Sequence, residues 1–213
     1  IIEDHAQCCL STYNGEIVGV SNAFSSWSFE STKHLSCGEG GILLTNDETY
    51  AEAARKVGGH GYKNLSADGG RIKFNDTTNV KDPSYKRHDA FGINYRLSEF
   101  SASIALAQLE DLHNKVENRK LVAKIFLDVM RDCDFLIPQH VPENCESSYY
   151  TLGVLYDEDV AGHTWQEFRD KFIDFGGDSF YSAWSIPYLE PVVVNREYVK
   201  RCPEVYESVS YEM

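Results

Sequence analysis

The sequence predicts an α/β fold, because short β-rich runs alternate with longer segments of helical periodicity. The apolar pair Ile1-Ile2 is interpreted as the end of a buried strand, and a polar loop at residues 3–7 follows it. Further β-rich runs lie at residues 17–20, 23–29 and 42–45. Apolar residues recur at helical spacing over residues 48–57 and 97–131. Strands and helices that alternate in this way are typical of a sheet covered by helices.

The first predicted helix has a signal at each end. Asn46 or Asp47 is expected to cap a helix over residues 48–57, and Gly58-Gly59 is expected to end it. Residues 59–90 are rich in Gly, Asn, Asp and Lys and show little periodicity. We interpret them as a long functional loop.

The second half of the chain predicts a bridging helix and a small α/β lobe. A single helix over residues 97–131 would be ~50 Å long, so we expect it to link two lobes or to bend near Asn118. Its apolar positions form two stripes, Ala105, Leu109, Leu112 and Val116, then Val122, Ile125, Phe126 and Val129. A strand at residues 149–156, a helix over residues 165–175 and a strand at residues 179–184 are predicted to follow.

The composition argues against several classes of partner. The chain carries 20 Lys and Arg against 33 Asp and Glu, a net charge of −13, which argues against nucleic acid and anionic membranes. No apolar run approaches the ~20 residues of a membrane span. Six cysteines without CxxC spacing and seven histidines without helical pairing indicate neither a disulfide framework nor a metal site. We therefore predict a cytoplasmic protein with reduced thiols.

The stretch around Lys33 is the strongest candidate for chemistry. An aromatic run at residues 27–29 leads into hydroxyl side chains and then the lysine, and a glycine-rich turn follows at residues 38–41. A lysine held near the end of a strand is a candidate nucleophile for Schiff-base chemistry. The alternative is a solvated surface charge, because most lysines are exposed.

Three motifs follow one another along the chain. They are Ile2-Glu3-Asp4-His5-Ala6-Gln7, then Ser28-Phe29-Glu30-Ser31-Thr32-Lys33 with Gly38-Glu39-Gly40-Gly41, then Gly92-Ile93-Asn94-Tyr95-Arg96. Together they resemble the DegT/StrS family of pyridoxal-phosphate-dependent sugar aminotransferases, a branch of the aspartate-aminotransferase fold. The resemblance implies a three-layer α/β sandwich, in which residues 1–115 are the remainder of the large cofactor domain and residues 116–213 begin a small domain. It also implies that this sequence is a piece of a longer chain.

The resemblance implies a role for each of four residues near the first two motifs. Asp4 matches the carboxylate that keeps the cofactor's ring nitrogen protonated, and Gln7 the residue that hydrogen-bonds its ring hydroxyl oxygen. Ser28 matches the serine that binds the cofactor phosphate. Lys33 matches the Schiff-base lysine, which also shuttles a proton during amino transfer. Surface or structural roles remain the alternatives for the glutamine and the serine.

The third motif implies a homodimer with shared sites. Asn94, together with Arg96, matches residues that reach the neighbouring subunit's site near the cofactor phosphate. An arginine fork suits a phosphate, although pairing of Arg96 with a nearby acid is an equal alternative.

The implied activity is transfer of an amino group from an amino acid, glutamate foremost, to a nucleotide-linked deoxysugar. The expected acceptor is a 4-keto-6-deoxy sugar, and the sequence does not identify its sugar, nucleotide or keto position. Pyridoxal 5′-phosphate would be the cofactor, with pyridoxamine 5′-phosphate as its aminated form. One alternative is a sugar dehydratase, whose relatives carry histidine in place of Lys33. The other is a non-catalytic binding or regulatory member of the family.

Overall fold

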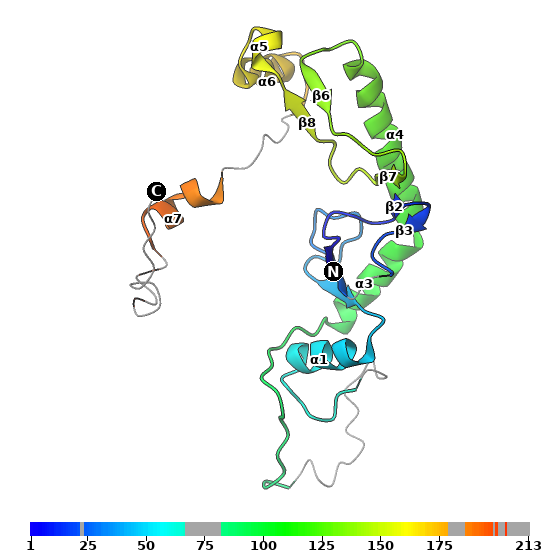
Figure 1. The fold of residues 1–213 in the computed structure, drawn as a ribbon, viewed down its shortest axis with the longest axis vertical. Helices are drawn as coiled ribbons and strands as arrows, with labels where there is room; N and C mark the ends of the chain where they lie inside the picture. Colours follow the sequence, from blue (N-terminus) through cyan, green and yellow to red (C-terminus); the bar gives the residue numbers. More distant parts are fainter. Residues whose placement is uncertain (22–23, 67–81, 179–185, 198, 200–202, 204–213) are drawn as a thin grey trace. The chain divides into compact units, whose positions relative to one another are not determined.

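The computed structural model (Figure 1) describes residues 1–21, 24–66, 82–178, 186–197, 199 and 203. The chain forms two compact units, Ile1–Asp157 and Glu158–Met213. The strands of the first unit are β1 (Ile2–Asp4), β2 (Thr12–Tyr13), β3 (Glu16–Ile17), β4 (Phe24–Ser28), β5 (Gly41–Leu44), β6 (Leu136–Pro138), β7 (Cys145–Glu146) and β8 (Val154–Tyr156). Its helices are α1 (Glu48–Gly58), α3 (Glu99–Glu110) and α4 (Leu112–Met130). This mixture of strands and helices confirms the predicted α/β class.

A three-stranded sheet in the order β1-β4-β5 lies beside the predicted site residues. β1 and β4 run parallel, with Asp4 opposite Ser26. β5 runs antiparallel to β4, with Gly41 opposite Ser28. Because β1 and β4 are parallel, their carboxyl ends lie at the same edge of the sheet.

The prediction of a buried strand at the start of the chain is wrong for the described residues. Ile1 and Ile2 are 87% and 79% exposed. The reason is that β1 is an outer strand, with β4 as its neighbour on one side only. The strand predicted from the β-rich run at residues 17–20 is also confirmed only at its first residue, since β3 ends at Ile17.

Helix α1 begins and ends where its sequence signals predict. The side chain of Asp47 accepts the N–H of Tyr50 at 3.0 Å and so caps the helix, and Gly59 closes the other end. The Tyr50 ring stacks on Phe24 of β4, with 5.0 Å between the ring centroids. The helix is therefore fixed against the sheet by an aromatic pair.

The long helical segment breaks at Asp111 and not near Asn118. Asp111 has φ −108° and ψ 9°, outside the helical range, and its N–H returns to the carbonyl oxygen of Gln108. Its carboxylate accepts the Asn114 side chain at 2.7 Å. The polar residues near Asn118 stay helical and belong to α4. The boundary between α3 and α4 lies two turns earlier (Figure 1).

A small apolar core joins the Lys33 loop to these two helices. Leu35 and Cys37 of the loop pack with Ala105, Leu112 and Val116. This confirms the first predicted stripe except for Leu109, which is exposed. The second stripe is wrong, because Val122, Ile125, Phe126 and Val129 are all exposed. The buried residue on that part of α4 is Ala123 instead. It lies seven residues after Val116, two helical turns along the same face.

Two smaller sheets complete the first unit. β2 pairs with β3 and β7, and β6 pairs with β8. The strand predicted at residues 149–156 is confirmed only for its last three residues, which form β8. Tyr149 has φ +47°, a left-handed conformation that no extended strand adopts.

The second unit contains short helices. They are α5 (Glu158–Ala161), α6 (Trp165–Asp174), the 3₁₀ helix η1 (Pro187–Leu189) and α7 (Pro191–Val194). α6 confirms the helix predicted over residues 165–175, and a capping box between Thr164 and Glu167 starts it. The strand predicted at residues 179–184 lies outside the described residues. No helix among the described residues is both long and apolar enough to cross a membrane.

Candidate functional site

Four predicted site residues follow the carboxyl ends of two adjacent parallel strands. Asp4 is the last residue of β1, and Gln7 lies three residues further on. Ser28 is the last residue of β4, and Lys33 lies five residues further on. Open α/β sheets bind ligands at this edge. The topology therefore collects Asp4, Gln7, Ser28 and Lys33 at an edge suited to a ligand.

The strand register also places two of these residues on one face of the sheet. Side chains alternate along a strand, and residues opposite each other share a face. Asp4 lies opposite Ser26, and therefore on the same face as Ser28, two residues further along β4. Glu3 lies on the other face, where its carboxylate accepts the buried Ser25 hydroxyl at 3.2 Å.

These residues keep hydrogen-bonding capacity that a ligand can use. One oxygen of Asp4 accepts the N–H of Ala6 at 2.9 Å, which leaves the other free to pair with a protonated ring nitrogen. Ser28 Oγ accepts the N–H of Glu30 at 3.2 Å, so its own hydrogen remains free to donate. Gln7 is exposed. A carboxylate, an amide, a hydroxyl and a lysine amine are the donor set that the implied cofactor needs, so the residues present fit it.

The side chain of Lys33 lies against an aromatic ring. Its Nζ is 4.7 Å from the ring centroid of Tyr150, and its backbone N–H donates to the Glu30 carbonyl oxygen at 3.1 Å. Among the described residues, Nζ makes no hydrogen bond and no ion pair. The amine is therefore held by a ring face and not neutralised by a carboxylate contact.

A hydrogen-bonded chain supports the turn before the lysine. Bonds from Ser31 and Thr32 lower the pKa of Glu30 to about 2, with a smaller contribution from the charge of Lys33. The ionised Glu30 accepts the Thr32 hydroxyl at 2.6 Å. Thr32 Oγ1 also lies 2.8 Å from the Tyr150 hydroxyl. Since Thr32 gives its proton to Glu30, Tyr150 must donate to Thr32.

His34, next to the candidate lysine, is buried and already satisfied. Its Nε2 donates to the carbonyl oxygen of Ser148 at 3.1 Å. Burial lowers the pKa of His34, a contribution larger than the opposing one from this hydrogen bond, and the charge of Arg119 lowers it further. The imidazole is therefore held neutral, with its donor nitrogen occupied.

The third motif forms a separate cluster that fixes the side chain of Asn94. Asn94 Oδ1 accepts both the N–H and the Nε of Arg96, at 3.3 and 3.0 Å. The Arg96 guanidinium also donates to Nε2 of His60 at 3.1 Å, because an arginine has no acceptor. The amide oxygen of Asn94 is thus occupied, and its NH₂ group is left to donate to a ligand.

This second cluster is not connected to the sheet edge within the chain. Among the residues that the structure describes, no hydrogen bond or ion pair joins Asn94 or Arg96 to Asp4 or Lys33. The residues around the motif expose large aromatic side chains. Phe91, Tyr95 and Phe100 are 98%, 71% and 85% exposed. We call these three residues the aromatic patch.

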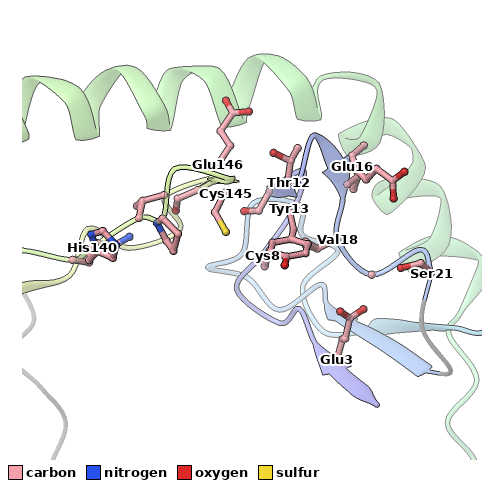
Figure 2. Close-up of a pocket in the computed structure, with 17 residues that line it drawn as sticks. Glu3, Cys8, Thr12, Tyr13, Glu16, Val18, Ser21, His140, Cys145 and Glu146 are labelled. Carbon is pink, nitrogen blue, oxygen red and sulfur yellow. The ribbon is translucent and has the colours of Figure 1, made fainter.

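A hollow elsewhere in the first unit does not coincide with the predicted site (Figure 2). It has a volume of about 660 Å³ and is lined by Glu3, Tyr13, His140 and Glu146, among others. Glu3 lies on the sheet face opposite Asp4. None of the six predicted site residues lines this hollow.

Sequence reasoning missed Tyr150 and His60, which contact Lys33 and Arg96, and Arg119, which contacts Tyr150. Tyr150 and Arg119 lie far from Lys33 along the chain, and no local pattern connects them to it. His60 carries a weak signal, because it precedes Gly61 at the start of a loop rich in turn residues. Its φ of +65° is uncommon for a residue with a side chain.

Comparisons with known proteins bear on the family. The sequence profile of the DegT/DnrJ/EryC1/StrS aminotransferase family matches residues 1–205. The spore coat polysaccharide biosynthesis protein SpsC of Bacillus subtilis (strain 168) is 26% identical over 203 residues, covering 94% of this chain and 48% of that protein. The structure of an aminotransferase from Psychrobacter cryohalolentis is 26% identical, with a TM-score of 0.72, and the match covers 92% of this chain and 50% of that one.

A solved dehydratase is similar as well. GDP-4-keto-6-deoxymannose-3-dehydratase (ColD), with bound GDP-perosamine, is 25% identical with a TM-score of 0.68, over 82% of this chain and 44% of that one. These likenesses confirm the predicted fold, that of pyridoxal-phosphate-dependent aminotransferases. The chain spans about half the length of the relatives it matches. Because the profile covers nearly the whole chain, the chain belongs to the DegT/DnrJ/EryC1/StrS aminotransferase family, a pyridoxal-phosphate-dependent family.

Proposed function

We propose that the whole protein transfers an amino group from glutamate or a similar amino acid to the keto group of a nucleotide-linked deoxysugar. One observation carries this proposal. Lys33 follows the carboxyl end of β4, and Asp4 ends the parallel strand beside it. A nucleophilic amine and a carboxylate at one sheet edge are what pyridoxal phosphate chemistry requires of a protein.

Each residue at this edge has a proposed task toward the cofactor. When bound, pyridoxal 5′-phosphate supplies an electron sink. Asp4 would hold a proton on the ring nitrogen through its free carboxylate oxygen, because the opposite charge favours the protonated ring. Gln7 would donate to the ring hydroxyl oxygen, and Ser28 would donate its free hydroxyl hydrogen to the phosphate. Lys33 Nζ would hold the cofactor and then move a proton to and from the reacting carbon.

A homodimer with shared sites is part of the proposal. Asn94 keeps an NH₂ donor and Arg96 a cationic fork, yet neither bonds to the sheet edge of its own chain. We propose that both serve the phosphate in the partner's site. The exposure of the three residues of the aromatic patch supports this, since large apolar side chains left in water mark contact surfaces. An isologous two-fold contact would bring each motif to the other subunit.

The dehydratase alternative receives less support from this sequence. A dehydratase of this family carries a histidine in place of the lysine, and here the lysine is present. His34, one residue later, does not replace it, because it is buried and its Nε2 is bonded to Ser148. The non-catalytic alternative is weaker for the same reason that carries the proposal: Asp4, Gln7, Ser28 and Lys33 are all retained.

The acceptor is proposed to be a 4-keto-6-deoxy sugar, since 4-amino sugars are common products in this family. The cationic residues of the loop at residues 59–90 are proposed to meet the nucleotide diphosphate. Of these, Lys63, Lys86, Arg87 and His88 are described, whereas Arg71, Lys73 and Lys81 lie outside the described residues. Replacing Lys86 and Arg87 together with glutamine should raise the KM for the sugar nucleotide and spare the glutamate half-reaction.

The substrate class is tested by a half-reaction screen of the whole protein. The protein is loaded with pyridoxamine phosphate and offered a panel of nucleotide keto-sugars, and the absorbance of the lysine-bound cofactor is followed. We expect it to return with a 4-keto-6-deoxy sugar nucleotide. Return with a simple keto acid or a cyclitol ketone, and with no sugar nucleotide, would contradict the proposed acceptor. Lys33→Ala protein should bind the cofactor through Asp4 and Ser28 and yet transfer no amino group.

A further inference from the structure

The ring of Tyr150 lies beside the Lys33 amine, and we infer that Tyr150 is a positioning residue for this amine, an inference that rests on the proposed role of Lys33. The distance of 4.7 Å between Nζ and the ring centroid is within the range in which a ring face attracts an ammonium group. Nζ has no hydrogen bond or ion pair among the described residues. The ring is therefore the group that the amine contacts, while the Glu30 carboxylate acts on it through charge alone.

Hydrogen bonds hold the Tyr150 ring in its position. The carbonyl oxygen of Tyr150 accepts Nη1 of Arg119, on α4, at 3.0 Å. The phenol donates to Thr32, which donates to the ionised Glu30. Hydrogen bonds at both the backbone and the hydroxyl leave the ring little freedom to turn away from the lysine.

The backbone beside Tyr150 is strained, which indicates that surrounding contacts hold this position in place. Tyr149 has φ +47°, a left-handed conformation that is unfavourable for a residue with a side chain. Such strain persists where surrounding contacts hold it in place, and here these are the bonds from Arg119 and to Thr32.

Three consecutive loop residues contact the same segment. Thr32 bonds the Tyr150 hydroxyl, Lys33 lies on its ring, and His34 bonds the carbonyl oxygen of Ser148. The loop that carries the lysine is therefore held against residues 148–150.

The arrangement suits an amine that must leave and return. During amino transfer, Lys33 Nζ has to stay within reach of the reacting carbon while it is not bonded to the cofactor. A ring face attracts the ammonium form only modestly. The Arg119 guanidinium, 5.6 Å from the same ring, adds a like charge that keeps the attraction weak. Tyr150 thus provides a reversible resting place for Nζ beside the sheet edge.

A labelling experiment on the whole, cofactor-free protein tests this contact without measuring activity. Acetylation rates of Lys33 and Lys63 are measured by peptide mapping with a neutral acetylating reagent. Lys63 is the internal reference, since its Nζ lies 4.1 Å from the Tyr85 ring. We expect Tyr150→Leu to raise the Lys33 rate about threefold, because the ring no longer stabilises or covers the ammonium group. Tyr85→Leu should change the Lys63 rate and leave that of Lys33 unchanged.

Tyr150→Phe keeps the ring and removes the hydroxyl. It therefore shows whether the ring itself, and not general packing, determines the Lys33 rate. Its Lys33 rate should stay near the wild-type rate. Equal Lys33 rates in wild type and Tyr150→Leu would overturn the inference. So would a Phe variant that reacts as fast as the Leu variant. If the Leu variant does not fold, the wild-type protein decides: ring currents of Tyr150 should shift the Lys33 ε-methylene proton signals upfield, and an unshifted signal would overturn the inference.

Kinetics of the cofactor-loaded protein separate this inference from the proposed function. Tyr150→Leu should lower kcat several-fold and leave the cofactor Kd and the KM for glutamate within about twofold, because it acts on the position of Nζ and not on binding. An unchanged kcat would overturn the positioning role while the aminotransferase proposal stands. If wild-type protein does not bond the cofactor through Lys33, the proposed function fails, whatever the labelling shows.

Discussion

The side chains around Lys33 satisfy one another, and no carboxylate in the part of the chain that the structure describes contacts the lysine amine. Glu30 is bonded by Ser31 and Thr32, and His34 by Ser148. The sequence motif predicts the identity of the lysine but not this environment, because the contacting residues 148–150 lie more than a hundred positions further along the chain. The chemistry of the amine thus depends on a contact that no local pattern shows.

His34 should make folding stability depend on pH. Its pKa is below the ordinary value of 6.5 in the folded protein, mainly because of burial, whereas the unfolded chain keeps the ordinary value. The unfolded state therefore binds more protons as the pH falls through about 6.5, and the free energy of unfolding falls. The contribution is complete above this pH and is lost on acidification toward the folded pKa.

This dependence is measured by urea unfolding at pH 7.5 and pH 5.5. We expect His34→Gln, which can still donate to Ser148, to lose part of the wild-type decrease in the free energy of unfolding. His163→Gln is the control, since His163 is exposed. An equal decrease in wild type and His34→Gln would contradict the assignment.

Among the secondary-structure elements, those with local end signals are the ones the sequence predicts well. α1 and α6 follow their caps, Asp47 and Thr164, because an N-cap acts through hydrogen bonds within one turn. The break at Asp111 and the turn at Tyr149 are not predictable in this way. Neither position carries a glycine or proline that would mark it, and the segment that follows Tyr149 is held by bonds from residues far away in the sequence.

The pairing of the loop segments that hold Asn94 depends on a glycine. Gly61 has φ +72°, and a Cβ there would overlap the carbonyl oxygen of Ala90. We expect Gly61→Ala to separate these segments and to lower the free energy of unfolding by about 2–4 kcal/mol, from the left-handed backbone and the overlap together. Gly15→Ala is the matched control, with φ +81° and nothing within 4 Å of a Cβ.

The control glycine should cost only the backbone term, about 1–2 kcal/mol. Thermal or urea unfolding of both variants measures the difference. Similar losses in the two variants would show that the close approach of Gly61 to Ala90 does not hold the loop. Weaker cofactor binding by Gly61→Ala is also expected, because Asn94 and Arg96 would lose their fixed orientation.

For the molecule as a whole, the strand order decides how much of the candidate site the sequence could reveal. Asp4 ends β1 and Lys33 follows the end of β4, so both lie toward one sheet edge because β1 and β4 are parallel neighbours. The place of Asn94 and Arg96 is different, since we propose that they serve the site of a partner subunit. Assembly is therefore the property on which the shared-site proposal depends.

The aromatic patch gives a direct test of assembly. Phe91→Ser with Phe100→Ser should shift the protein from dimer to monomer in analytical ultracentrifugation, because the two side chains are 98% and 85% exposed in the single chain. Phe175→Ser is the control, as Phe175 is 92% exposed but lies in the other unit. A double variant that stays dimeric would contradict a contact through this patch.

Shared sites are tested by mixing two inactive variants. One carries Asn94→Ala and Arg96→Ala, and the other carries Lys33→Ala. Random hybrids should restore about a quarter of wild-type activity, because half of the dimers would hold one intact site. Subunit exchange is verified first. If the mixture then restores no activity, each chain completes its own site.

The most direct test of the account is to find which lysine bonds the cofactor. The whole protein is loaded with pyridoxal phosphate, reduced with borohydride and digested, and the labelled peptide is mapped. We predict the label on Lys33, which follows β4 and whose amine forms no ion pair with any residue that the structure describes. A label on Lys63, or on any lysine other than Lys33, would contradict the proposed site and the function built on it.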